Sequence, residues 1–171
     1  MTFDGDLDHR RDEASRAISS LIPSVAKAHR RLAGSLLKDV GLAAGQEFVL
    51  MLLWDRSPQA QADLTKQLAV EPPTTAKALA RLETLGLVSR ERSASDRRVV
   101  LVSLTDQGRA LEGPVLSIWT ALEEETTSAL TIDEQRQLRA LLERVKDSLP
   151  GSTVEVGQEP KGRADGSTAT N

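Results

Sequence analysis

The order of short segments in the middle of the chain limits the fold more than any other feature of the sequence. Ser57–Leu68 and Pro72–Leu85 are predicted helices, and the three residues between them suffice only for a turn. Proline near the start of each helix is tolerated, because the first N–H groups of a helix have no partner within it. Gly86 ends the second helix, since glycine tolerates the left-handed cap conformation.

Two strand-like segments follow directly. Leu87–Arg92 and Arg98–Leu104 are joined by five small or polar residues, and the second segment is rich in valine and leucine. This pattern predicts a hairpin. Two short helices, a tight turn and a hairpin together predict a winged helix-turn-helix, in which the hairpin is the wing.

Longer helices are predicted before this segment. Glu13–Val40 places apolar residues at steps of three and four, which indicates an amphipathic helix that Gly41 ends. Pro23 lies inside it and predicts a kink or break near Ser20–Pro23, because an interior proline removes one backbone hydrogen bond and clashes with the preceding turn. Ala44–Asp55 is apolar nearly all round, so we expect a central, buried helix.

Two further helices are predicted after the hairpin. Thr105 caps the first of them, and Gly113-Pro114 should bend it. Thr131 and Glu134 form the capping box of the second. Apolar helices at both ends of so small a domain need a partner surface, which a two-fold dimer supplies. The predicted fold class is mainly α with a small β-hairpin wing: a winged helix-turn-helix domain plus a helical dimerisation region.

Both ends of the chain are predicted to lie outside the fold. Residues 1–12 are polar, which predicts a flexible acidic arm. Residues 150–171 contain almost no large apolar side chain, which predicts a disordered tail. The domain between them is 13–149, with the winged helix-turn-helix at 44–104 and the dimerisation helices at 13–40 and 105–149.

Composition excludes several classes of function. The chain has 171 residues, no cysteine and two histidines, which rules out disulfides, thiolate catalysis and cysteine-ligated zinc. It has no serine-nucleophile elbow, no zinc-binding His-Glu-x-x-His helix and no phosphate-cradling glycine loop. We therefore expect no enzyme, no catalytic residue, no cofactor and no metal site. No apolar run could span a membrane and the N-terminus resembles no secretory signal, so we expect a cytoplasmic protein without membrane partners.

The net charge of −3 is unevenly distributed. Between Gln59 and Ser103 seven cations outnumber five anions, whereas fifteen cations and twenty anions lie elsewhere. The middle of the chain is therefore the candidate site for a polyanion. A solvated charged surface is the alternative.

The second short helix has one face that suits DNA. Its inward stripe comprises Thr75, Leu79, Leu82 and Leu85. The opposite face comprises Thr74, Lys77, Ala78 and Arg81. Short polar and cationic side chains around one small residue can approach base edges and phosphates in a major groove, which predicts a recognition helix. An ordinary amphipathic surface helix is the alternative.

The predicted wing adds a second cationic feature. Four arginines lie within nine residues: Arg90, Arg92, Arg97 and Arg98. An arginine on a narrow hairpin can enter a minor groove, where the negative potential is focused. Asp96 is expected to accept from a nearby arginine and hold its guanidinium, and Ser95 beside it completes the DNA-binding candidates. The alternative is an exposed hairpin that its charges keep soluble.

Five motifs occur in a fixed order. They are Ala62-Asp-Leu-Thr-Lys-Gln-Leu68, Pro73-Thr-Thr-Ala-Lys-Ala-Leu79, Arg81-Leu-Glu-Thr-Leu-Gly-Leu-Val88, Asp96-Arg-Arg98 and Leu104-Thr-Asp-Gln-Gly-Arg109. Together they resemble the MarR family of bacterial transcriptional regulators over about Glu13–Leu149. The Asp-x-Arg wing followed by Leu-Thr-x-x-Gly is the most specific element.

The resemblance implies an obligate homodimer held by its first and last helices. It also implies binding to a short palindrome in double-stranded DNA, usually as a repressor, with release by a small, often aromatic or anionic, ligand. Arg98 matches the wing-tip arginine of the family and Asp96 its supporting carboxylate. The positions that match the recognition helix are Thr74, Thr75, Lys77 and Arg81. Pro72-Pro73 departs from the family pattern, and the absence of cysteine excludes the cysteine-based peroxide sensors.

A small-molecule effector is the remaining expected partner. In the family its pocket lies between the dimerisation helices and the winged domain, and the candidates by position are His29, Arg30, Phe48, Trp54 and Trp119. Core packing is the alternative for the three aromatic residues, and exposure or a dimer contact is the alternative for His29. A protein-interaction module that keeps the winged fold without binding DNA is the alternative to the regulator as a whole.

Overall fold

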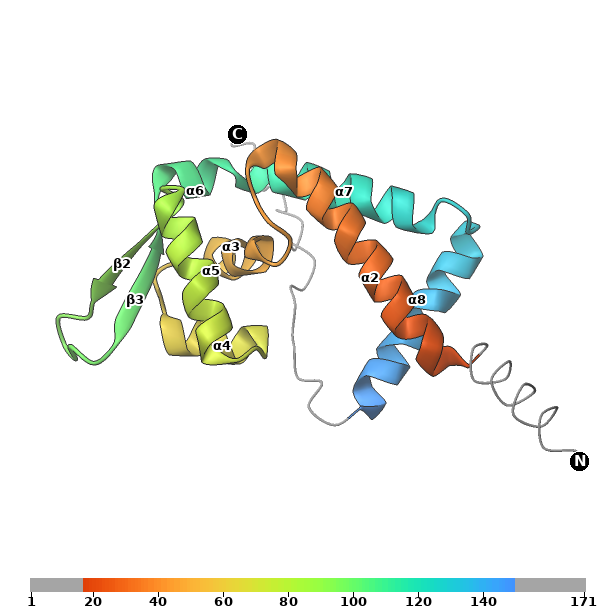
Figure 1. Ribbon diagram of the computed structural model, residues 1–171, viewed down its shortest axis with the longest axis horizontal. Helices are drawn as coiled ribbons and strands as arrows, with labels where there is room; N and C mark the ends of the chain where they lie inside the picture. Colours follow the sequence, from red (N-terminus) through yellow and green to blue (C-terminus); the bar gives the residue numbers. More distant parts are fainter. Residues whose placement is uncertain (1–16, 150–171) are drawn as a thin grey trace, which may run out of the picture. The chain divides into compact units, whose positions relative to one another are not determined.

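The computed structural model describes residues 17–149, which form two compact units (Figure 1). The first unit comprises residues up to Glu47 together with Ala110–Lys146, and the second is built on Phe48–Arg109. The predicted arm at 1–12 and tail at 150–171 lie outside the described residues. Within residues 17–149, no helix has both the length and the apolar character needed to cross a membrane.

The described part of the first unit contains helices and connecting turns but no strand. Its main elements are α2 (Ile18–Leu37), the short 3-10 helix η1 (Lys38–Val40), α7 (Glu112–Thr127) and α8 (Ile132–Ser148). Helix α2 packs against α7. The buried residues of these two helices are Ala33, Leu37, Val115 and Leu122, whereas α8 has none. Leu138, Leu141 and Leu142 of α8 are therefore exposed large apolar side chains.

Helix α2 continues through Pro23, so a break at the predicted place, Ser20–Pro23, is absent. Pro23 has no N–H to donate to the preceding turn, and the helix continues despite this lost hydrogen bond. The predicted end is confirmed: η1 follows the α-helix, and Gly41 adopts a left-handed φ of 74°. Residues 13–16 of the predicted helix lie outside the described part.

The single bent helix predicted after Thr105 is two helices. Helix α6 spans Asp106–Ala110, helical structure breaks at Leu111, and α7 then begins. Pro114 explains the break, because it has no N–H to donate one turn back toward Ala110. The capping box of α8 is confirmed: the Thr131 backbone N–H donates to Glu134 Oε2 at 2.8 Å, and the Glu134 N–H donates to Thr131 Oγ1 at 3.4 Å.

The second unit contains the predicted helix pair and hairpin. Its elements are α3 (Gln46–Asp55), β1 (Gln59–Ala60), α4 (Gln61–Leu68), α5 (Pro72–Thr84), β2 (Val88–Arg92), β3 (Val100–Leu104) and α6. The strands form an antiparallel sheet in the order β1-β3-β2, with Arg90 opposite Val102. The predicted mainly α fold with a β-hairpin wing is confirmed. Figure 1 shows the hairpin extending beyond the helices of its unit.

The sequence prediction missed strand β1. Ser57–Ala60 was expected to open a helix, but Gln59 and Ala60 pair with β3, and α4 begins only at Gln61. Gln59 is buried and its side-chain Nε2 donates to the carbonyl groups of Leu52 and Arg56, at 2.5 and 2.8 Å. These bonds satisfy carbonyl groups at the end of α3, so they favour an extended Gln59 over an earlier start of α4.

Candidate nucleic-acid interface

Helix α5 presents the predicted outward face. It begins with Pro72 and Pro73 and buries Leu79 and Leu82, which places the core on one side. On the opposite side, Thr74, Lys77 and Arg81 are exposed and Ala78 is half-buried. The side chains of the first three make no hydrogen bond or ion pair with any residue in 17–149. They are therefore available to an external partner.

Thr75 does not belong to this outward face. Its exposed fraction is 1%, and its hydroxyl lies in the core without a hydrogen-bond partner among the described residues. The position matches the recognition helix of the family, but it also falls on the inward stripe at helical spacing. In the structure Thr75 is buried with the inward stripe, so the prediction that Thr75 contacts DNA is wrong.

The Leu-Thr-x-x-Gly motif joins α5, the hairpin and α6. Thr105 donates its hydroxyl hydrogen to the Gly86 carbonyl at 2.6 Å and accepts the Gly108 N–H at 3.0 Å. The Thr105 N–H donates to the Leu87 carbonyl at 3.1 Å. Trp54 donates its indole N–H to the Gly108 carbonyl at 2.9 Å. The motif therefore fixes the base of the wing, a role that sequence reasoning did not assign to it.

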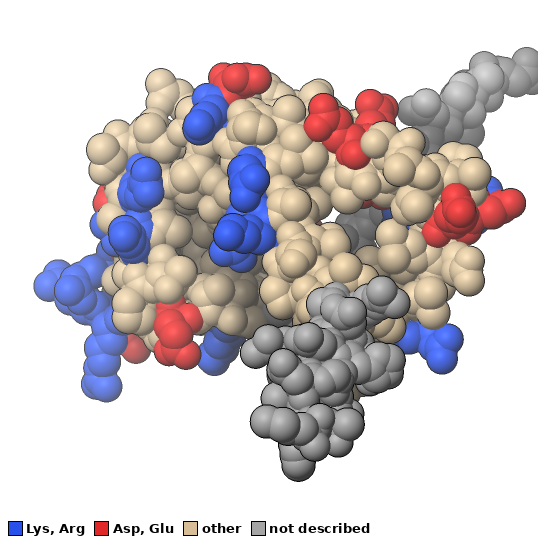
Figure 2. Space-filling view, turned by 45° about the vertical axis from the view of Figure 1, so that its right-hand side comes forward, with Lys and Arg blue, Asp and Glu red and all other residues tan. Residues whose placement is uncertain are grey.

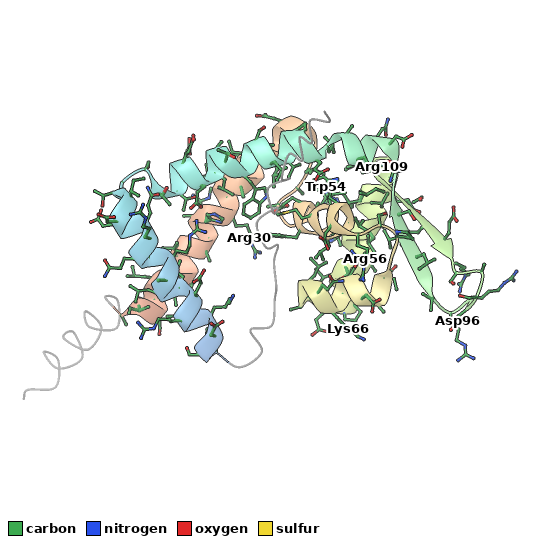
Figure 3. All side chains as sticks on the ribbon, turned by 180° about the vertical axis from the view of Figure 1, so that it is seen from behind. Arg30, Trp54, Arg56, Lys66, Asp96 and Arg109 are labelled. Carbon is green, nitrogen blue, oxygen red and sulfur yellow. The ribbon has the colours of Figure 1, made fainter. Side chains whose placement is uncertain are left out.

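Gly108 is required by the close approach of another backbone segment. A Cβ atom at this position would lie 2.1 Å from the Leu87 carbonyl oxygen and 3.1 Å from Leu104 Cδ2. Figure 3 shows Trp54 pointing toward the α6 end of the unit, where Arg109 is labelled. Helix α6 and the backbone of Leu87, just before β2, are thus in contact at Gly108, where a side chain would not fit.

The tip of the wing is closed by its own hydrogen bonds. Arg92 donates from its guanidinium to the Arg97 carbonyl at 2.6 Å. Asp96 Oδ1 accepts the backbone N–H of Arg98 at 2.9 Å, and Ser95 shares a side-chain hydrogen bond of 2.9 Å with Ser93. Figure 3 shows Asp96 at the end of the hairpin. The expected partner of Asp96 was a guanidinium; the structure corrects this to a backbone amide, because the tight turn brings that N–H closer.

Arg90 lies further back on the wing and is paired. Its Nε and one terminal nitrogen donate to Glu83 Oε2 at 3.0 and 2.5 Å, and the two side chains are 29% and 39% exposed. These hydrogen bonds lower the pKa of Glu83, because they favour its ionised form. Glu83 was missed by the sequence analysis, which had only its charge and helical position as signals.

Arg97 and Arg98 differ from the other two wing arginines. Both are exposed, and neither guanidinium has a hydrogen-bond or ion-pair partner within the described part of the chain. Figure 2 shows lysine and arginine side chains projecting on the left, the side on which Figure 1 places the hairpin. This end of the second unit can therefore attract a polyanion.

The effector candidates are divided between the two units. His29, Arg30 and Trp119 lie in the first, and Phe48 and Trp54 lie in the second. The hydrogen bond of Trp54 to Gly108 gives this residue a structural role, as in the core-packing alternative. No group of three metal-ligating His, Asp or Glu side chains occurs within residues 17–149.

Glu47, next to these candidates in the sequence, was not singled out by sequence reasoning. It is only 3% exposed, and burial raises the pKa of its carboxyl group, against the opposing effects of the Gly45 N–H at 2.6 Å and the positive charge of Arg30. A buried carboxylate in the first turn of a predominantly apolar helix is an unusual feature of this sequence. The folded protein therefore disfavours ionisation of this carboxyl group.

Comparisons with known proteins extend these observations. The MarR family model matches residues 42–100. The transcriptional regulator MgrA of Staphylococcus aureus is 32% identical over 126 residues, which cover 74% of this chain and 84% of that protein. It is described as a helix-turn-helix regulator.

Solved structures show the same architecture. A MarR variant from E. coli in complex with operator DNA is 32% identical, with a TM-score of 0.69 over 75% of this chain and 92% of that one. Bordetella bronchiseptica BpsR, whose DNA binding is regulated by 6-hydroxynicotinic acid, is 27% identical, with a TM-score of 0.71 over 79% and 96% of the two chains.

Proposed function

This chain belongs to the MarR family, and on that premise we propose that it is a DNA-binding transcriptional regulator rather than an enzyme. It acts as a homodimer that binds a short palindromic operator, represses transcription and is released by a small-molecule ligand. The observation that carries the proposal is the set of side chains on α5 and at the wing tip that have no partner among residues 17–149. They are Thr74, Lys77, Arg81, Arg97 and Arg98.

These groups match the chemistry of duplex DNA. Arginine and lysine side chains that have no partner among the described residues can neutralise phosphates or reach base edges. The small side chain of the half-buried Ala78 allows α5 to approach the major groove closely. The wing arginines extend the contact toward an adjacent minor groove. The similarity to the operator-bound E. coli MarR variant supports this mode of binding.

The dimer is supported by apolar side chains that this chain leaves exposed. On α2 they are Ile18, Leu21, Ile22 and Val25, and on α8 they are Leu138, Leu141, Leu142 and Val145. Soluble monomers seldom expose so many large apolar residues on neighbouring positions. A two-fold interface built from 13–40 and 105–149 would cover them, and two copies of 44–104 would then address half-sites roughly 10 base pairs apart.

Ligand release is supported by the regulation of BpsR, a relative with the same fold. The candidate effector residues remain His29, Arg30, Phe48, Trp54 and Trp119. Among them Arg30 is an exposed cation and suits an anionic ligand. A ligand that shifts the protein toward a form with lower DNA affinity must bind that form more tightly.

The test begins with fragments of genomic DNA selected by the purified full-length protein. Affinity for a selected duplex should fall steeply as salt increases, because lysine and arginine contacts release counterions. Arg98→Ala should weaken binding and leave the dimer intact. Arg136→Ala on α8 removes an equal charge from a residue that is not among the proposed DNA contacts, and in a protein that remains dimeric we expect affinity for DNA to be nearly unchanged.

Repression is tested separately, by placing a selected fragment before a reporter gene. Expression should fall when the regulator is present. Absence of duplex affinity even at low salt would reject the DNA-binding proposal in favour of a protein-interaction module. Full affinity of the Arg98→Ala protein would remove this residue from the interface.

A further inference from the structure

The contact between Glu83 and Arg90 joins the two DNA-facing elements to each other. Glu83 lies in α5 and Arg90 lies in β2, seven residues later, and these elements pack together. One carboxylate oxygen accepts two hydrogen bonds from the guanidinium, at 3.0 and 2.5 Å. Two bonds from a planar guanidinium fix direction as well as distance.

The strand register explains why Arg90 turns toward the helix. Side chains alternate between the two faces of a strand, so Val88 and Arg90 share a face. Val88 is 2% exposed and belongs to the core. Arg90 therefore leaves the same face at the edge of the core, where the last turn of α5 presents Glu83. Its guanidinium therefore already donates two hydrogen bonds to Glu83 in the protein without DNA.

Arg92 is also occupied, but within the wing. It continues the same alternation one step further along β2 and donates to the Arg97 carbonyl at 2.6 Å. This bond holds the peptide that immediately precedes Arg98, while Asp96 holds the Arg98 N–H. The charges of Arg97 and Arg98 are thereby presented from a closed turn and have no partner in residues 17–149.

We infer that the four wing arginines divide into two pairs with different tasks, and that Glu83 is a positioning residue of the DNA interface. Glu83, through Arg90, sets the wing relative to the recognition helix, and Arg92 sets the tip. Arg97 and Arg98 make the DNA contacts of the wing. This inference rests on the proposed DNA binding and refines it.

The physical consequence is preorganisation. A recognition helix and a wing that enter neighbouring grooves must hold one relative orientation. If this orientation is already fixed in the free protein, binding does not have to pay the entropic cost of ordering it. Sequence-specific binding uses both elements in one register, whereas non-specific binding can use charge alone. Loss of the Glu83–Arg90 pair should therefore reduce affinity for a selected duplex more than affinity for a scrambled one.

The first test compares two substitutions that remove the same charge. Glu83→Gln breaks the pair, whereas Glu91→Gln removes an exposed carboxylate from the next position of β2 that has no partner in the described residues. If only charge mattered, both variants would bind DNA more tightly. We expect Glu91→Gln to bind equally or more tightly, and Glu83→Gln to bind a selected duplex on the order of tenfold more weakly, since the dimer loses two such pairs.

The second test uses the salt dependence of binding. Each phosphate contact contributes about 0.9 to the slope of log affinity against log salt, so Arg97→Gln or Arg98→Gln in both subunits should reduce the slope by about 1.8. Arg90→Gln should weaken binding with the slope unchanged. A slope that falls by the same amount for Arg90→Gln would overturn the division into pairs.

The third test exchanges the two charges. Arg90→Glu alone should bind poorly, and the double variant Glu83→Arg with Arg90→Glu should recover affinity, because it restores an ion pair at unchanged net charge. A double variant as weak as Arg90→Glu would show that Arg90 itself contacts DNA. Circular dichroism and light scattering confirm folding and assembly of each variant. If the wild-type protein binds no duplex, the proposed function fails; if it binds and these variants rank differently, only the positioning role of Glu83 fails.

Discussion

Replacing Gly108 by alanine should destabilise the second unit strongly. The added Cβ would lie 2.1 Å from the Leu87 carbonyl oxygen, and real contacts of this kind essentially never fall below 3.0 Å. The two segments must therefore separate by at least 0.9 Å. The contact atom belongs to the backbone of a buried residue, so no flexible side chain can move aside to make room.

The magnitude follows from what this separation breaks. The Leu87 carbonyl accepts the Thr105 N–H at 3.1 Å, and Gly108 itself accepts from Trp54 at 2.9 Å. Overpacking costs about 1–3 kcal/mol, and each lost hydrogen bond adds about 1 kcal/mol. We expect a loss of about 3 kcal/mol, which lowers the melting temperature by roughly 6–12 °C in a protein of this size.

The assay is thermal unfolding followed by circular dichroism at one fixed protein concentration. Gly34→Ala is the matched control, because a Cβ there would make only an ordinary contact of 3.7 Å with Ala44 Cβ and the residue lies inside α2. Alanine is the better helix former by about 0.5–1 kcal/mol, so the control should be equally or more stable. Equal melting temperatures for Gly108→Ala and the wild type would refute the close approach of α6 and Leu87.

Three further substitutions test other parts of the fold. Burial raises the pKa of Glu47, so ionisation of this carboxyl group destabilises the protein as pH rises above about 4.3. Glu47→Gln should therefore raise the melting temperature more at pH 7 than at pH 4.5. Equal increases at the two pH values would contradict this prediction. Thr131→Ala removes the capping box of α8 and should cost about 1 kcal/mol by denaturant unfolding, whereas no loss would mean that the cap contributes nothing. Leu141→Asp should convert the proposed dimer to a monomer in light scattering, and an intact dimer would exclude this face of α8 from the interface.

The sequence predicted the elements whose limits depend on local chemistry. Gly41 ends the first described helix region with a left-handed φ, Pro72 opens α5, and the Thr131 box opens α8. Each of these signals acts within one helical turn. Hydrophobic spacing likewise predicted the core side of α5, because helix geometry alone decides which residues share a face.

The parts that sequence reasoning missed depend on contacts between distant residues. Two residues of β1 carry no strand pattern, and only their pairing with Val102 and Leu101 defines them. Charge marked the wing arginines as a group, but it could not show that Arg90 faces Glu83 while Arg98 faces solvent. Thr75 matched two patterns at once, and packing decided between them.

The outward side chains of α5 have a consequence for how this protein can change. The side chains of Thr74, Lys77 and Arg81 make no hydrogen bond or ion pair with other residues in 17–149, so substituting them removes no side-chain bond from the fold. Substitutions at such surface positions usually alter stability by less than about 0.5 kcal/mol. Under the proposed mode of binding, the preferred DNA sequence can therefore drift, or be selected from a library randomised at these positions, while the scaffold that displays them keeps its stability.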